Sequence, residues 1–213
     1  MADYGLQVVG SHGVIQVDQN YFNLQFKQSG WVTTSNVANS YVEFSVSAIN
    51  PLIVLKSPDA VATIIATTRS GNTYTYRIAA ATATTVYWYL FDSSVPTPSN
   101  GYGLRVYNSA GQLTFDSGTR ALKIYSLLSD VSVGSGTTGG KIADLPAGNW
   151  GTILTRPRVT GTPGAKPILS QMAARVTATE LFVFATSFTY ASGTSAVYNG
   201  QCDLLLVDLT GIA

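Results

Sequence analysis

The stretch YGLRVYNSAGQLTFDSG, residues 102–118, decides the fold because it has the pattern of a β-hairpin. Leu104 and Val106 alternate with more polar neighbours, and a period of two places such neighbours on opposite faces of a strand. The NSAG segment supplies turn chemistry, since Asn tolerates a positive φ and Gly takes the left-handed position that closes a short loop. Leu113 and Phe115 resume the alternation, so we expect the four apolar side chains to share one face.

The same hairpin occurs near the N-terminus. The stretch YGLQVVGSHGVIQVD, residues 4–18, aligns with residues 102–116 at a constant offset of 98 (102 minus 4, and 116 minus 18). The Tyr, Gly, Leu and Val of the first strand coincide, as do the Gly of the turn and the final Asp. Internal repeats are sought first because they change the expected number of domains.

Fainter matches follow in the same order, between residues 53–58 and 152–157 and between Arg77-Ile78 and Arg175-Val176. The alternative is that any two β-domains share hairpins and Pro-terminated strands. We interpret the matches as a tandem duplication, with one domain over residues 1–97 and a second over residues 98–213. The Pro-, Ser- and Gly-rich segment Val95–Gly101 is the expected linker.

Short alternating segments recur along both halves, and helical periodicity is almost absent. This spacing predicts an all-β fold made of two related antiparallel β-sandwich units, immunoglobulin-like or jelly-roll-like. The strands expected in the sequence are Tyr21–Phe26, Tyr41–Val46, Leu52–Lys56, Ala60–Thr68, Thr73–Ile78, Thr85–Phe91, Ala121–Leu128, Trp150–Thr155, Ile168–Val176, Glu180–Tyr190 and Asp203–Leu209. The loops expected are Gly30–Asn39, Gly134–Gly140 and Val159–Pro167.

The composition is poor in charge. Of 213 residues, 46% are hydrophobic and only 11% are charged, against about 25% in typical soluble domains. The net charge of +1 and the lack of a basic run argue against nucleic-acid binding. No apolar run approaches the ~18 residues of a membrane span, and no signal-peptide pattern is present, so we expect synthesis in a cytoplasm without membrane insertion.

Catalytic and metal-binding patterns are weak. His12 is the only histidine and Cys202 the only cysteine, which predicts no catalytic, metal-ligating or cofactor-binding residues, and no enzyme. Asp18 and Asp116 both follow a hairpin, and there an Asp side chain can accept backbone N–H groups in an Asx-turn. We therefore interpret both as structural, and Cys202 as a small buried residue.

Aromatic residues are the more informative candidates. Tyr87, Trp88 and Tyr89 are consecutive, so one face of their strand cannot bury all three. Tyr74 and Tyr76 share a face of the preceding strand. Tyr and Trp pack in cores, but exposed ones stack on sugars or bury at subunit contacts. Tyr74, Tyr76 and Trp88 are therefore the candidate ligand or subunit contacts, with core packing as the alternative.

The two copies of Tyr-Gly-Leu-x-Val, followed by a Gly turn and Phe-Asp or Val-Asp, resemble a recurring motif in tail-associated proteins of tailed bacteriophages. The resemblance covers residues 4–18, residues 102–117 and the strand Val86–Phe91. Val9 and Val17 depart from the usual form. Members are small proteins of unassigned biochemical activity, encoded among tail-tip and tail-fibre genes. The resemblance implies a virion component near the distal tail and no catalytic residues.

Three functions are compatible with these features. The first is a structural tail-tip or tail-fibre protein, located in the virion tail and contributing to assembly and host attachment. The others are a carbohydrate-binding, lectin-like receptor-binding module and a capsid decoration protein. A charge-poor surface favours burial in an assembly, so the expected partners are other copies of the chain, other tail proteins and a host surface glycan or protein. The resemblance favours a homotrimer.

Overall fold

β-Strands make up the regular structure, as the alternating pattern predicts. The computed structural model describes residues 7–9, 15–18, 23–35, 41–94, 101–131, 140–156, 159–162, 168–189 and 202–212, and no helix occurs among them. The strands, in chain order, are β1 (Gln7–Val9), β2 (Ile15–Asp18), β3 (Gln25–Thr33), β4 (Val42–Ser47), β5 (Pro51–Lys56), β6 (Ala62–Ser70), β7 (Thr73–Ala80), β8 (Thr85–Asp92), β9 (Arg105–Tyr107), β10 (Leu113–Asp116), β11 (Ile124–Val131), β12 (Gly140–Asp144), β13 (Trp150–Arg156), β14 (Val159–Thr162), β15 (Ile168–Val176), β16 (Glu180–Thr189) and β17 (Cys202–Asp208).

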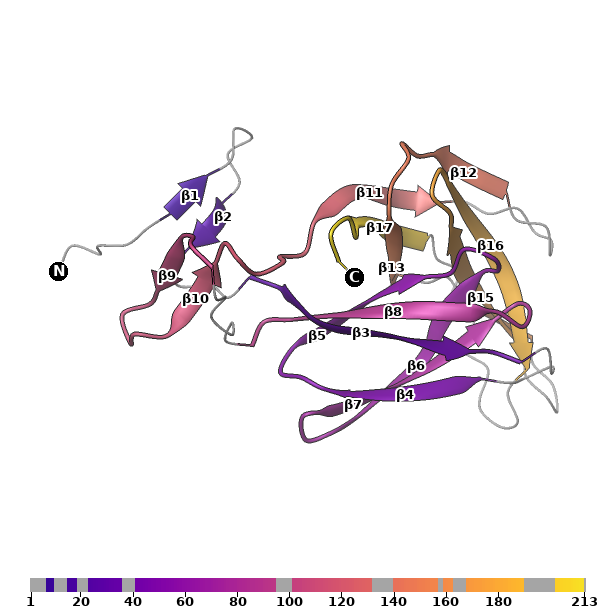
Figure 1. Ribbon diagram of the computed structural model, residues 1–213. Helices are drawn as coiled ribbons and strands as arrows, with labels where there is room; N and C mark the ends of the chain where they lie inside the picture. Colours follow the sequence, from indigo (N-terminus) through magenta and orange to yellow (C-terminus); the bar gives the residue numbers. More distant parts are fainter. Residues whose placement is uncertain are drawn as a thin grey trace.

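Two large antiparallel sheets form a β-sandwich, and two small hairpins lie beside it (Figure 1). The six-stranded sheet has the order β11-β17-β13-β5-β8-β3. The seven-stranded sheet has the order β12-β16-β15-β6-β7-β4, with β14 paired to β15. The hairpins β1–β2 and β9–β10 lie together at the left of the view, where β2 and β10 are in contact.

The two halves follow the same strand order in both large sheets, as a duplication predicts. Outward from the centre of the six-stranded sheet, the N-terminal half contributes β5, β8 and β3, and the C-terminal half contributes β13, β17 and β11. The seven-stranded sheet repeats this plan with β6, β7 and β4 against β15, β16 and β12. Because β5 and β13 pair antiparallel, as do β6 and β15, the two halves are related by an approximate two-fold rotation.

The two halves contact each other in both large sheets, and we call this contact the seam. Each sheet crosses the seam at one register position, Thr152 opposite Leu55 and Ala174 opposite Ala62. The predicted division between residues 97 and 98 falls in the segment 95–100, outside the described residues, and stays a prediction. Strands from before and after this segment are neighbours in both large sheets.

Three apolar clusters make up the core. One lies between the sheets in each half, around Ile78 and Leu90 in the first half and around Leu181 and Leu204 in the second. The third cluster includes Phe91, Val207 and Leu209 and covers the outer face of the six-stranded sheet. The six-stranded sheet is therefore apolar on both faces over much of its area, which explains its nearly continuous hydrophobic sequences.

The second hairpin has the predicted turn. Gly111 adopts a φ of 74°, the left-handed conformation that a glycine tolerates best. The side-chain Oδ1 of Asn108 accepts the backbone N–H groups of Ala110 at 3.0 Å and Gln112 at 2.9 Å. Asn and Gly at these positions therefore hold the loop closed, as their turn preferences predict.

Three predictions of local structure are wrong. Gly30–Thr33, expected in a loop, belongs to β3, because the segment pairs residue by residue with β8 from Trp88 to Thr85. Val159–Thr162, also expected in a loop, forms β14 by pairing with β15. The strand β12 was not predicted at all, since it starts at the last glycine of the expected loop Gly134–Gly140. The remainder of that loop, residues 134–139, lies outside the described residues.

Candidate functional site

Two of the three candidate aromatic residues pack in the core between the two large sheets and do not form an exposed surface. Tyr76 of β7 is only 6% exposed, and Trp88 of β8 is half-buried against the same core. The ring of Phe44 lies between them, with centroids 5.3 Å from Tyr76 and 4.4 Å from Trp88. The interplanar angles of 21° and 8° make this a stack. It ties the seven-stranded sheet to the six-stranded one, and such ring pairs stabilise beyond the area they bury.

The electrostatics of the stack agree with burial. Burial, together with smaller contributions from the neighbouring Tyr74 and Asp92, raises the pKa of Tyr76 to about 12. The Nε1 group of Trp88 has no hydrogen-bond partner among the described residues. Its ring lies over Gly30, where an added Cβ would come within 2.5 Å of the ring. Packing thus fixes Trp88 and requires glycine beneath it.

Tyr74 lies at the rim of this cluster. Its hydroxyl donates to the carbonyl oxygen of Ile49 at 3.2 Å, and the Arg69 guanidinium lies 5.1 Å from its ring centroid. As predicted, Tyr74 and Tyr76 share one face of β7, since both pack against the same core cluster. A role for Tyr74, Tyr76 or Trp88 in contacting a ligand or subunit stays a prediction.

A second aromatic pair, which the sequence analysis missed, lies on the opposite face of the six-stranded sheet. Trp31 of β3 is 66% exposed, and its cross-strand partner Tyr87 of β8 is also exposed. The next cross-strand pair on the same face is Thr33 opposite Thr85, two residues further along each strand. The signal that could have found Trp31 is the alternation of β3, which Gly30 interrupts. Lys56 of β5 lies opposite Tyr87 on the other side, so the pair offers two large rings next to a lysine.

The far edge of the same sheet also exposes apolar side chains. Ile124, Tyr125 and Leu127 of β11 are each more than half exposed. β11 is the end strand of the sheet order among the described residues, and its sequence from residue 124 to 129 has no charge. Natural edge strands normally carry charged residues or proline that prevent pairing with another chain. The edge at β11 lacks this protection over most of its length.

Asp116 has the structural role expected of it. Its Oδ1 accepts the backbone N–H of Gly118 at 2.7 Å, which is an Asx-turn, and its Oδ2 accepts from Arg105 Nε at 3.1 Å. Its side chain is fully buried. His12 and the side chain of Asp18 lie outside the described residues. Cys202 is buried, as expected.

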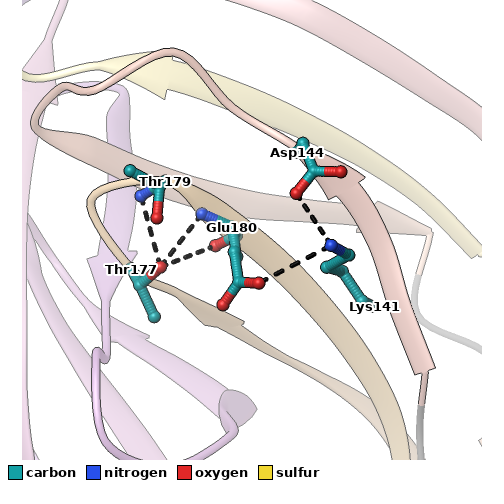
Figure 2. Close-up of polar contacts among 5 residues, drawn as sticks. All are labelled: Lys141, Asp144, Thr177, Thr179 and Glu180. Carbon is teal, nitrogen blue, oxygen red and sulfur yellow. Dashed lines mark hydrogen bonds and ion pairs between the residues drawn. The ribbon is translucent and has the colours of Figure 1, made fainter.

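The clearest cluster of charges lies where β12 meets β16 (Figure 2). Lys141 Nζ lies 2.8 Å from Asp144 Oδ1 and 3.6 Å from Glu180 Oε1. Thr177 Oγ1 accepts the backbone N–H of Glu180 at 3.0 Å and so caps the turn between β15 and β16. All three charged groups are accessible to solvent, so this cluster joins an edge strand to its neighbour and does not resemble a catalytic constellation.

Other chemistry is sparse in the part of the chain that the structure describes. There, no three His, Cys, Asp or Glu side chains are grouped closely enough to hold a metal ion. No helix within the described ranges is long and apolar enough to cross a membrane. Comparisons of the chain with protein-family models, with curated proteins and with solved structures found no match.

Proposed function

We propose that the protein is a structural virion protein of a tailed bacteriophage, part of the distal tail, the tail tip or a fibre. The observation that carries the proposal is the repeated hairpin motif, which resembles tail-associated proteins. In support, the two hairpins lie together beside the sandwich rather than within it (Figure 1). Tyr107 of β9 is exposed to solvent. A projecting pair of hairpins suits attachment to a neighbouring protein better than catalysis.

Assembly into a homo-oligomer is the second part of the proposal, with a trimer favoured by the resemblance. Large apolar side chains are exposed at both open edges of the six-stranded sheet. Trp31 lies on the edge strand β3, next to Tyr87 of β8, and the Ile124–Leu127 segment lies on the edge strand β11. An obligate interface buries roughly 2,000 Å² or more and is more apolar than a transient one. Two apolar edges on each copy allow each subunit to contact two others, as a closed ring requires.

Sedimentation velocity of the purified chain at micromolar concentration tests this assembly. We expect a particle three times the 22.5 kDa mass of the chain, and we expect Leu127→Lys to shift it to the monomer because a charge would be buried at the interface. Thr68→Lys, at an exposed position of β6 in the other sheet, is the matched control and should leave the trimer intact. A stable monomer of the unmodified chain would contradict the assembly proposal.

A lectin-like module remains a second candidate because one observation favours it. Trp31 and Tyr87 lie side by side on an exposed face with Thr33 and Thr85 next to them. Aromatic faces stack on sugar rings, while hydroxyl groups exchange hydrogen bonds with them. Binding of a neutral oligosaccharide that Trp31→Ser abolishes, in a chain that sediments as a monomer, would favour this candidate over the structural one.

A further inference from the structure

A cleft of about 410 Å³ opens between the segment that joins β10 to β11 and the turn that follows β17. Its volume lies within the range of small-ligand sites, roughly 300–1,000 Å³. The cleft is lined by Phe115, Ser117, Thr119, Arg120, Ala121, Lys123, Asp208, Thr210, Gly211 and Ile212. None of its lining residues belongs to the Trp88 stack, so the candidate aromatic residues do not account for it, although Lys123 directly precedes the exposed edge strand β11.

The charge of the cleft is positive. Arg120 and Lys123 are both exposed, and neither lies within ion-pair distance of a carboxylate among the described residues. Asp208 is the single carboxylate of the lining, and its Oδ1 already accepts the backbone N–H of Thr210 at 2.8 Å. The Thr210 side chain and, to a smaller extent, the charge of Lys123 lower the pKa of Asp208, so Lys123 is already partly balanced. Two cations beside one anion still leave the lining with a positive charge that can bind an anionic group.

The rest of the lining is suited to a polyhydroxylated molecule. Ser117 Oγ accepts the backbone N–H of Leu104 at 2.9 Å, so its own hydroxyl hydrogen is free to be donated. Thr119 Oγ1 donates to the carbonyl oxygen of Asp116 at 2.7 Å, so its lone pairs remain to accept. Phe115 and Ile212 add apolar surface. Hydroxyls on an apolar floor match the two kinds of surface that a sugar ring presents.

The duplication supplies an internal comparison. In the first half, Gln25 faces Asp92 at the corresponding end of the sheet, and both side chains are buried. In the second half, Lys123 takes the position of Gln25, and its carbonyl oxygen accepts the N–H of Asp208 at 2.9 Å. The corresponding strand ends are therefore buried in the first copy, where Gln25 faces the Asp92 carboxylate, and Lys123 is exposed in the second, where it lines the cleft with Asp208 and Arg120.

We propose that this cleft binds an acidic sugar unit, with Arg120 and Lys123 holding its anionic group and the hydroxyls of Ser117 and Thr119 its sugar hydroxyls. The anionic group is a carboxylate, as in a uronic acid, or a phosphate ester. The inference goes beyond the proposed structural role and does not depend on it, because the cleft is formed within one copy of the chain.

Isothermal titration of the full chain with glucuronate, glucose 6-phosphate, glucose and inorganic phosphate tests the proposal. We expect at least one of the two acidic sugars to bind about tenfold or more tightly than both glucose and inorganic phosphate. If glucuronate binds and glucose 6-phosphate does not, the anionic group of the ligand is a carboxylate. If glucose 6-phosphate binds and glucuronate does not, it is a phosphate ester. Equal binding of glucose or of inorganic phosphate would overturn the proposal, as would no binding at about 10 mM.

Two variants locate the site. Arg120→Gln and Lys123→Gln should each weaken the acidic sugar about tenfold while leaving the circular dichroism spectrum unchanged, because both side chains are exposed. Arg69→Gln removes an exposed cation from the turn between β6 and β7 and is the matched control. If Arg69→Gln weakens binding as much as Lys123→Gln does, the interaction is general attraction to positive charge and the cleft is not the site.

Discussion

Gly151→Val is expected to destabilise the protein by about 3 kcal/mol, within the upper range for overpacking a close-packed core. Gly151 lies in β13 at the seam, where an added Cβ would meet Val54 Cγ1, would lie 2.8 Å from Leu209 Cδ1 and would lie 3.3 Å from the Leu55 carbonyl oxygen. Val54 and Leu209 are fully buried, so neither side chain can move into solvent. Urea unfolding followed by tryptophan fluorescence measures the change.

The matched control is Gly140→Val in β12. It also lies in a strand, but an added Cβ there meets nothing within 4 Å. We expect its free energy of unfolding to stay within about 0.5 kcal/mol of the unmodified chain, as for most surface substitutions. Equal effects of the two variants would show that the halves do not approach as closely as the seam requires.

Asp92→Ala is expected to cost about 3 kcal/mol, because it leaves two backbone donors without their acceptor. The buried carboxylate of Asp92 accepts the N–H of Asn50 at 2.7 Å and the N–H of Ile49 at 3.2 Å, which fixes the turn between β4 and β5. Asp59→Ala, at an exposed position, is the control and should be nearly neutral. Thermal unfolding of both variants, monitored by circular dichroism, measures the difference.

The same carboxylate predicts an acid-dependent loss of stability. Burial raises the pKa of Asp92, but the N–H groups of Asn50 and Ile49, together with hydrogen bonds from Ser94 and Ser93, outweigh that effect and hold the pKa below its ordinary value of 3.8. A lowered folded-state pKa contributes stability that is present above pH 3.8 and lost as the pH falls through the folded value. Asp92→Asn should remove this part of the pH dependence. An unchanged acid profile in Asp92→Asn would contradict the assignment.

Local patterns predicted most strands and the turn of the second hairpin, because both depend on near neighbours. The alternation of residues 41–46 and the Asn108 and Gly111 of that turn act over a few positions. β3 was only partly predicted because Gly30 has the signature of a loop, whereas its real requirement is space beneath the Trp88 ring. That requirement comes from a strand far away in the sequence, which no local pattern records.

The candidate sites were harder to predict, because exposure depends on which face another sheet covers. Trp88 and Tyr87 are adjacent and equally aromatic, yet one packs between the sheets and the other is exposed. The strands β5 and β13, and likewise β6 and β15, pair at one register position each, and no local sequence pattern predicts which strands meet there. The cleft beside Lys123 is lined by residues 115–123 and by residues 208–212, which are more than 80 positions apart. Only the folded chain brings these two segments together.

The location of the chain in intact particles tests the proposed function most directly. Phage particles purified by density gradient would be labelled with a gold-conjugated antibody against the chain and imaged by electron microscopy. We predict gold at the distal end of the tail, in several copies per particle. Gold on the capsid would contradict the tail assignment in favour of a decoration protein, and purified particles that contain none of the chain would contradict a structural virion role altogether.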